Sequence, residues 1–137
     1  MVKIIMGLKG SGKTKQLLDL LQKAVDEENG FVVCIERDPD LRYTIPSKAR
    51  HVCTSYYGGK GLDFFKGFIS GLHAGNYDIS HIFIDGLYKI IDGTNSAGVD
   101  EFLEWLVKLS ENEGVNITLT LSADTSMATE TIKKYLI

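Results

Sequence analysis

Residues 7–14 read Gly7-Leu8-Lys9-Gly10-Ser11-Gly12-Lys13-Thr14. The apolar residues 2–6 before this stretch predict a buried strand, and residues 13–29 after it predict an amphipathic helix. A strand that turns through glycines into a helix directs backbone N–H groups at one point, where the helix dipole favours an anion. The pattern G-x-x-x-x-G-K-[ST] in this setting predicts a phosphate-binding loop, with Lys13 at the terminal phosphates and Thr14 on Mg²⁺. The alternative is a glycine-rich turn that matches by chance.

Length and composition indicate an ordinary globular protein. A chain of 137 residues predicts a single domain spanning residues 1–137. With 44% hydrophobic and 24% charged residues and a net charge of −3, nothing supports nucleic-acid binding, for which a basic domain is expected. No segment reaches the roughly 18 apolar residues of a membrane span. Because the first strand begins at once, we expect no signal peptide and a cytoplasmic protein.

The cysteines and histidines show no pattern that indicates a metal site. Cys34 and Cys53 each lie in an apolar run, which predicts buried, reduced thiols rather than a disulfide. Two isolated cysteines without a nearby histidine pattern are too few ligands for a metal. The histidines His51, His73 and His81 share no spacing, and we expect them to be structural.

Strands and helices are expected to alternate along the whole chain. Strands are predicted at 2–6, 31–35, 50–54, 79–84 and 115–121, and helices at 13–29, 62–75, 99–113 and 127–135. Gly30 and Gly114 are expected to end the helices before them, and segments 36–50 and 85–97 to be connections. This order predicts an α/β fold with a mainly parallel sheet covered by helices on both faces. A ligand is then expected at the carboxyl ends of the strands.

A second motif reads His81-Ile82-Phe83-Ile84-Asp85. It places a carboxylate directly after an apolar strand, and therefore at the edge of the sheet where the ligand is expected. Asp85 can hold Mg²⁺ there, opposite Thr14. The alternative is that Asp85 only begins a turn with Gly86.

The two motifs and the order of elements together resemble the P-loop NTPase superfamily, over nearly the whole chain. The resemblance implies a three-layer fold, ATP and Mg²⁺ as ligands, and metal ligation by Thr14 and Asp85. At least one strand is expected to lie between the strand before the loop and the strand before Asp85. This strand order resembles the RecA-type and type II thymidine kinase branch. The chain is also similar in size and layout to small bacterial ATP-binding proteins. The implied nucleotide contacts are Gly7, Leu8, Lys9, Gly10, Ser11, Gly12, Lys13 and Thr14.

The resemblance also suggests a catalytic acid. Type II thymidine kinases carry a glutamate after the aspartate, but here Gly86 follows Asp85. RecA-type proteins place a catalytic glutamate at the end of a neighbouring strand, and Glu36 is the matching residue, with Asp38 as the second candidate. The catalytic set implied by the resemblance is therefore Lys13, Glu36 and Asp85. The alternative for Glu36 is a solvated loop acid.

Weaker candidates follow two other predicted strands. Arg37, Arg42 or Arg50 can act as an arginine finger, although pairing with surface acids is the simpler role. Ser122 and Asp124 can sense the γ-phosphate, and helix capping is the competing use.

Three functions are compatible with these observations. The first is a Mg-dependent ATPase or ATP-driven switch with slow hydrolysis, which acts with an unidentified protein partner or by self-assembly. The second is a nucleotide-binding module that does not hydrolyse. The third is a small-molecule kinase of the nucleoside type, for which residues 37–61 leave little room for an acceptor pocket and a lid. The N-K-x-D signature for guanine is absent, and we take ATP as the expected nucleotide.

Overall fold

The computed structural model describes residues 1–137. Its strands are β1 (Val2–Gly7), β2 (Phe31–Glu36), β3 (Ala49–Cys53), β4 (Ile79–Ile84) and β5 (Asn116–Ser122). Its α-helices are α1 (Lys13–Glu27), α2 (Leu62–Ala74), α3 (Leu87–Ile91), α4 (Ser96–Glu113) and α5 (Glu130–Lys133). Two short 3₁₀ turns, η1 (Thr54–Tyr57) and η2 (Thr125–Met127), complete the chain.

The five strands form one sheet in the order β1-β5-β4-β2-β3. Every neighbouring pair is parallel, so all the carboxyl ends meet at one edge. The predicted α/β class with a parallel sheet is therefore confirmed. β5 lies between β1 and β4, as expected from the sequence.

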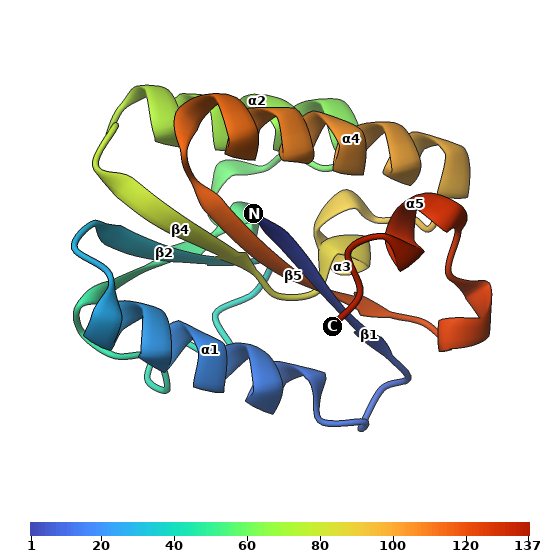
Figure 1. Ribbon diagram of the computed structural model, residues 1–137, viewed down its shortest axis with the longest axis horizontal. Helices are drawn as coiled ribbons and strands as arrows, with labels where there is room; N and C mark the ends of the chain where they lie inside the picture. The colour runs from blue at the N-terminus through green and yellow to red at the C-terminus, as the bar shows by residue number, and fades with distance from the viewer.

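Helices cover both faces of the sheet (Figure 1). α1 lies on one face, and α2 and α4 lie together on the other. Neighbouring residues Ile4 and Ile5 of β1 belong to different core clusters, with Ile5 packed beside Leu17 and Leu21 of α1. Alternate side chains of a strand point to opposite faces, so residues 31–35 of β2 form a continuous apolar run because both faces of the sheet are covered.

The ends of two helices test the roles predicted for glycines. Gly114 ends α4 in the left-handed region, with φ 66°, as predicted. Gly30 does not end α1, because the helix already stops at Glu27 and Glu28 is extended. A Cβ at position 30 would lie 2.5 Å from the Ser80 Cβ, so Gly30 is needed for close approach to β4 rather than for helix termination.

Two predicted segments differ from the structure. The predicted connection 85–97 contains α3, in which Leu87, Ile90 and Ile91 are buried; this single apolar turn between glycines is too short for a clear helical period. The predicted helix 127–135 is reduced to η2 and the four-residue α5. The chain then runs along β1, where Ile4 donates to the Tyr135 carbonyl at 2.8 Å. No helix has both the length and the apolar character of a membrane span.

Candidate functional site

The carboxyl edge of the sheet carries a cavity of about 440 Å³. It is lined by the glycine loop (residues 7–14), the start of α1 and the ends of β2, β4 and β5. None of its 15 lining residues is hydrophobic. A cavity of this kind suits charged groups and metal ions rather than an aromatic base.

The glycine loop leaves hydrogen-bond donors facing this cavity. Gly10 and Gly12 have φ of 84° and 88°, and a Cβ at either position would meet open space. No side chain caps the N-terminus of α1, so its first N–H groups remain available to an anion. The Lys13 ammonium donates to the Leu8 carbonyl at 3.0 Å, which keeps its charge over the loop.

Thr14 and Asp85 meet at the same cavity. The Thr14 hydroxyl lies 3.3 and 3.4 Å from the two carboxylate oxygens of Asp85. Thr120 holds this carboxylate from β5 by donating to Oδ1 at 3.0 Å, and its own Oγ1 accepts from the Gly86 N–H at 2.8 Å. Gly86 does turn the chain, with φ 76°, but Asp85 is also fixed toward Thr14. A carboxylate and a hydroxyl at this spacing are the hard oxygen ligands that Mg²⁺ prefers.

Glu36 is the last residue of β2 and also lines the cavity. Its side chain is not a solvated loop acid, because only 4% of the residue is exposed. Oε2 accepts from the Leu41 N–H at 2.8 Å and lies 2.6 Å from His51 Nε2. The loop after β2 and the neighbouring strand β3 therefore fix this carboxylate at the cavity.

Only one of the three candidate arginines borders the cavity. Arg37 lines it but pairs with Asp38 at 3.0 Å. Arg42 packs over the Tyr56 ring, and Arg50 lines a separate groove beside α2.

Of the two candidates at the end of β5, one lines the cavity and the other does not. Ser122 lines the cavity, whereas Asp124 caps η2 by accepting from the Ser126 N–H at 2.8 Å. This hydrogen bond lowers the pKa of Asp124. Sequence reasoning missed Thr120 and Lys89, which also line the cavity. The signal for Thr120 was its polar side chain in an apolar strand, whereas Lys89 was hidden by the undetected α3.

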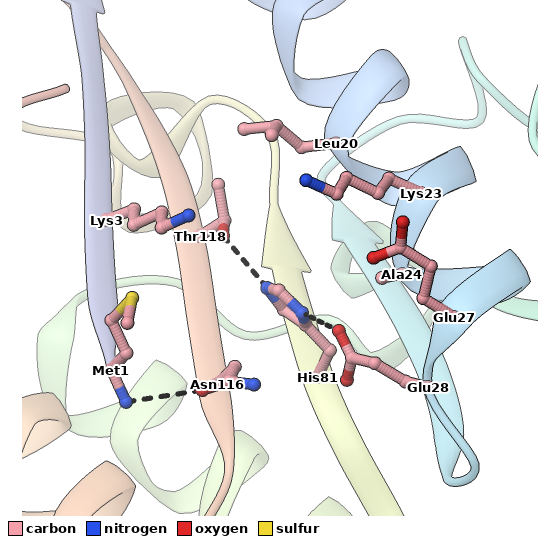
Figure 2. Close-up of a pocket in the computed structure, with 10 residues that line it drawn as sticks. All are labelled: Met1, Lys3, Leu20, Lys23, Ala24, Glu27, Glu28, His81, Asn116 and Thr118. Atoms are coloured by element: carbon pink, nitrogen blue, oxygen red, sulfur yellow. Dashed lines mark hydrogen bonds and ion pairs between the residues drawn. The ribbon is translucent and has the colours of Figure 1, made fainter.

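His81 fits the structural role expected for it (Figure 2). Its two ring nitrogens lie 2.8 Å from Glu28 Oε2 and 2.9 Å from Thr118 Oγ1, and its ring stacks on Phe83. Burial lowers the pKa of His81, and the Glu28 carboxylate opposes that shift in part. His73 is also buried.

His51 is different, because it contacts both Glu36 and Cys53. The two cysteines are free and buried, as predicted. Burial raises the pKa of both thiols.

No protein-family model matches this chain, and no curated protein matches it.

Proposed function

We propose that this chain is a P-loop protein that binds Mg-ATP and hydrolyses it slowly. The observation that carries this proposal is the meeting of Thr14 and Asp85, which lie 71 residues apart in the sequence, with 3.3 Å between hydroxyl and carboxylate. Lys13 and the uncapped N-terminus of α1 border the same cavity. A chance glycine-rich turn gives no reason for a carboxylate to face the threonine of the motif.

The binding mode follows from the groups on the cavity wall. The N–H groups of residues 7–14 hold the β- and γ-phosphates, and the Lys13 ammonium exchanges the Leu8 carbonyl for a phosphate oxygen. Thr14 and Asp85 hold Mg²⁺ against these phosphates. Because the lining lacks hydrophobic side chains, the base lies outside the cavity.

Hydrolysis requires a group that orients water toward the γ-phosphate, and Glu36 is the candidate at this edge. Its Oε2 is already engaged by Leu41 and His51, which leaves Oε1 for a water molecule. Arg37 pairs with the neighbouring Asp38 carboxylate, and no arginine points at the glycine loop. A P-loop site without an arginine finger hydrolyses slowly, so we expect slow turnover by the isolated chain.

The second candidate is a nucleotide-binding module without hydrolysis. The burial of Glu36 and its two hydrogen bonds favour it, because they limit how far the carboxylate can follow a water molecule. Both candidates share the binding site and differ only in turnover.

Two measurements on the parent chain test the proposal. Calorimetry should show tighter binding of Mg-ATP than of metal-free ATP, and Mg-GTP in the same experiment measures the base preference. Phosphate release should then be slow, and unchanged by thymidine as an acceptor. Binding without phosphate release selects the module, phosphate transfer to thymidine selects the kinase, and the absence of nucleotide binding refutes the proposal.

A further inference from the structure

Three donor groups of different chemistry meet at the outer end of β2 and β3. They are the Glu36 carboxylate, the His51 imidazole and the Cys53 thiol, whose donor atoms all lie within 4.8 Å of one another. Glu36 and Cys53 are buried, and His51 is partly buried. In the proposed nucleotide site His51 only holds the Glu36 carboxylate, and no interaction of that site uses Cys53.

Strand register brings these side chains together. Glu36 pairs with Cys53 across the β2–β3 ladder, and Cys34 pairs with His51. Partners in a parallel ladder face the same side, and so do residues two apart in one strand. The three side chains therefore converge on one face because of the backbone, and no loop rearrangement is needed to assemble them.

We propose that Glu36, His51 and Cys53 form a binding site for a zinc-class divalent metal ion. Thiolate, imidazole and carboxylate are the ligands that zinc takes in proteins, and three protein ligands with a water molecule complete a tetrahedral site. The site is separate from the proposed Mg²⁺ ligands Thr14 and Asp85, which offer only hard oxygen atoms.

The donor atoms reach this coordination after two side-chain adjustments. Around zinc, with bonds of about 2.0 Å to nitrogen or oxygen and about 2.3 Å to sulfur, N···S pairs lie about 3.6 Å apart and N···O pairs about 3.3 Å apart. Cys53 Sγ lies 3.7 Å from His51 Nε2 but also 3.9 Å from Nδ1. The thiol therefore lies against the ring, and a side-chain rotation of His51 or Cys53 is needed to place it around a metal on Nε2. His51 Nε2 and Glu36 Oε2 are 2.6 Å apart, as a shared proton requires, and the metal replaces that proton as the pair widens.

Binding of the metal ion moves the protons of Cys53 and His51. The Cys53 thiol releases its proton to solvent and binds as thiolate. The proton that His51 Nε2 shares with Glu36 moves through solvent to Nδ1, so that the imidazole stays neutral and Nε2 binds the metal. Glu36 binds as carboxylate.

The metal site shares Glu36 with the proposed nucleotide site. A bound metal holds the carboxylate that hydrolysis needs, so zinc should slow turnover without displacing Mg-ATP. This consequence rests on the proposed function, whereas metal binding itself does not.

Cobalt titration of the nucleotide-free chain tests the site. Co²⁺ replaces zinc in tetrahedral sites, and a thiolate ligand gives it an intense near-ultraviolet charge-transfer band. We expect this band to appear with one equivalent of Co²⁺ and to disappear when Zn²⁺ is added. A parent chain that gives no thiolate band refutes the site, whatever any variant does.

Variants identify the ligands. Cys53→Ser should remove the band, and His51→Gln should weaken Co²⁺ binding by at least about tenfold, the lower end of what even an outer-shell partner contributes. Cys34→Ser, on the paired position of β2, is the matched thiol control and should keep the band. Asp85→Asn should also keep it. A band that survives Cys53→Ser, or that requires Cys34, refutes this ligand set.

The consequence for turnover is measured separately. Zn²⁺ should slow phosphate release by the parent chain and have no such effect on Cys53→Ser. Equal inhibition of both chains refutes the coupling to Glu36. A chain that releases no phosphate overturns the ATPase proposal, while the cobalt titration still decides the metal site.

Discussion

The two ends of α1 both border a polar cavity, and they differ in how their polar groups are satisfied. At its N-terminus, a cavity of about 440 Å³ is bordered by the glycine loop and an uncapped helix end. At its C-terminus, a cavity of about 210 Å³ lies between the helix and the sheet, lined by Lys3, Lys23 and His81 among others. Figure 2 shows this second cavity.

Several polar groups at the C-terminal cavity pair with one another or with nearby residues of the protein. Both nitrogens of His81 have partners, and the N-terminal amine of Met1 contacts Ser110 and Asn116. The only ion pair among the lining residues joins His81 to Glu28, so the charges of Lys3, Lys23 and Glu27 are unpaired. Glu28 Oε1 is buried without a partner. Cations near a helix C-terminus are also favourable in the absence of any ligand.

The N-terminal cavity lies at the positive end of the helix dipole. The first N–H groups of α1 have no side-chain cap there, and Lys13 adds a further cation. Polarity and volume alone therefore do not distinguish a binding site from a structural cavity. The uncapped backbone N–H groups at the start of α1 do, because they converge on one point where an anion can bind.

The largest effect on nucleotide affinity is expected when Lys13 is replaced. Lys13→Ala should weaken Mg-ATP binding by about 100-fold, because a charged hydrogen bond contributes up to about 3 kcal/mol. Lys23→Ala, at the other end of the same helix, is the matched control and should leave affinity unchanged. Calorimetry measures both, with circular dichroism to verify folding. Equal affinities for the two variants would remove the distinction between the two cavities.

A smaller effect is expected from Asp85→Asn. It should weaken Mg-ATP binding by about tenfold and metal-free ATP binding much less, because Asp85 acts through the metal. Asp124→Asn is the control, since Asp124 follows the neighbouring strand but caps η2 instead of lining the cavity. If Asp85→Asn loses affinity equally with and without Mg²⁺, Asp85 is a turn residue only.

Glu36→Gln should slow phosphate release by about tenfold and leave ATP affinity nearly unchanged, because a group that orients water acts mainly in the transition state. The glutamine carbonyl can still accept from the Leu41 N–H, which preserves the local structure. Glu28→Gln, at the other cavity, should not alter the rate. Turnover of Glu36→Gln as fast as that of the parent would exclude Glu36 and make Asp38 the next candidate.

The smallest effect is expected from His81, on how the free energy of unfolding depends on pH. Its folded-state pKa is lowered, mainly by burial, so the unfolded chain, with an ordinary pKa of about 6.5, binds the proton first as pH falls. The free energy of unfolding should therefore decrease on acidification below about pH 6.5. Urea denaturation at several pH values should show a weaker decrease for His81→Gln. An identical pH profile would mean that His81 does not contribute.

Local signals in the sequence were sufficient for most of the fold. Apolar runs predicted most of the strands, whereas β3, with Arg50 and His51, had only a weak signal. Helical spacing predicted α1, α2 and α4, because these helices are long enough for their period to be visible. α3 was missed because one apolar turn, Leu87–Ile91, shows no period. The C-terminal helix was overestimated because the residues that follow α5 pair with β1 instead, a contact that local sequence does not encode.

The sequence by itself determined the glycine loop, because G-x-x-x-x-G-K-[ST] is a local pattern whose strand and helix lie on either side of it. It also determined that Asp85 ends a strand. Tertiary structure alone decided that Asp85 faces Thr14, that Glu36 is buried, and that His51 and Cys53 lie beside Glu36. These contacts depend on strand order and register, which are set by the packing of both faces of the sheet and not by the sequence near any one residue.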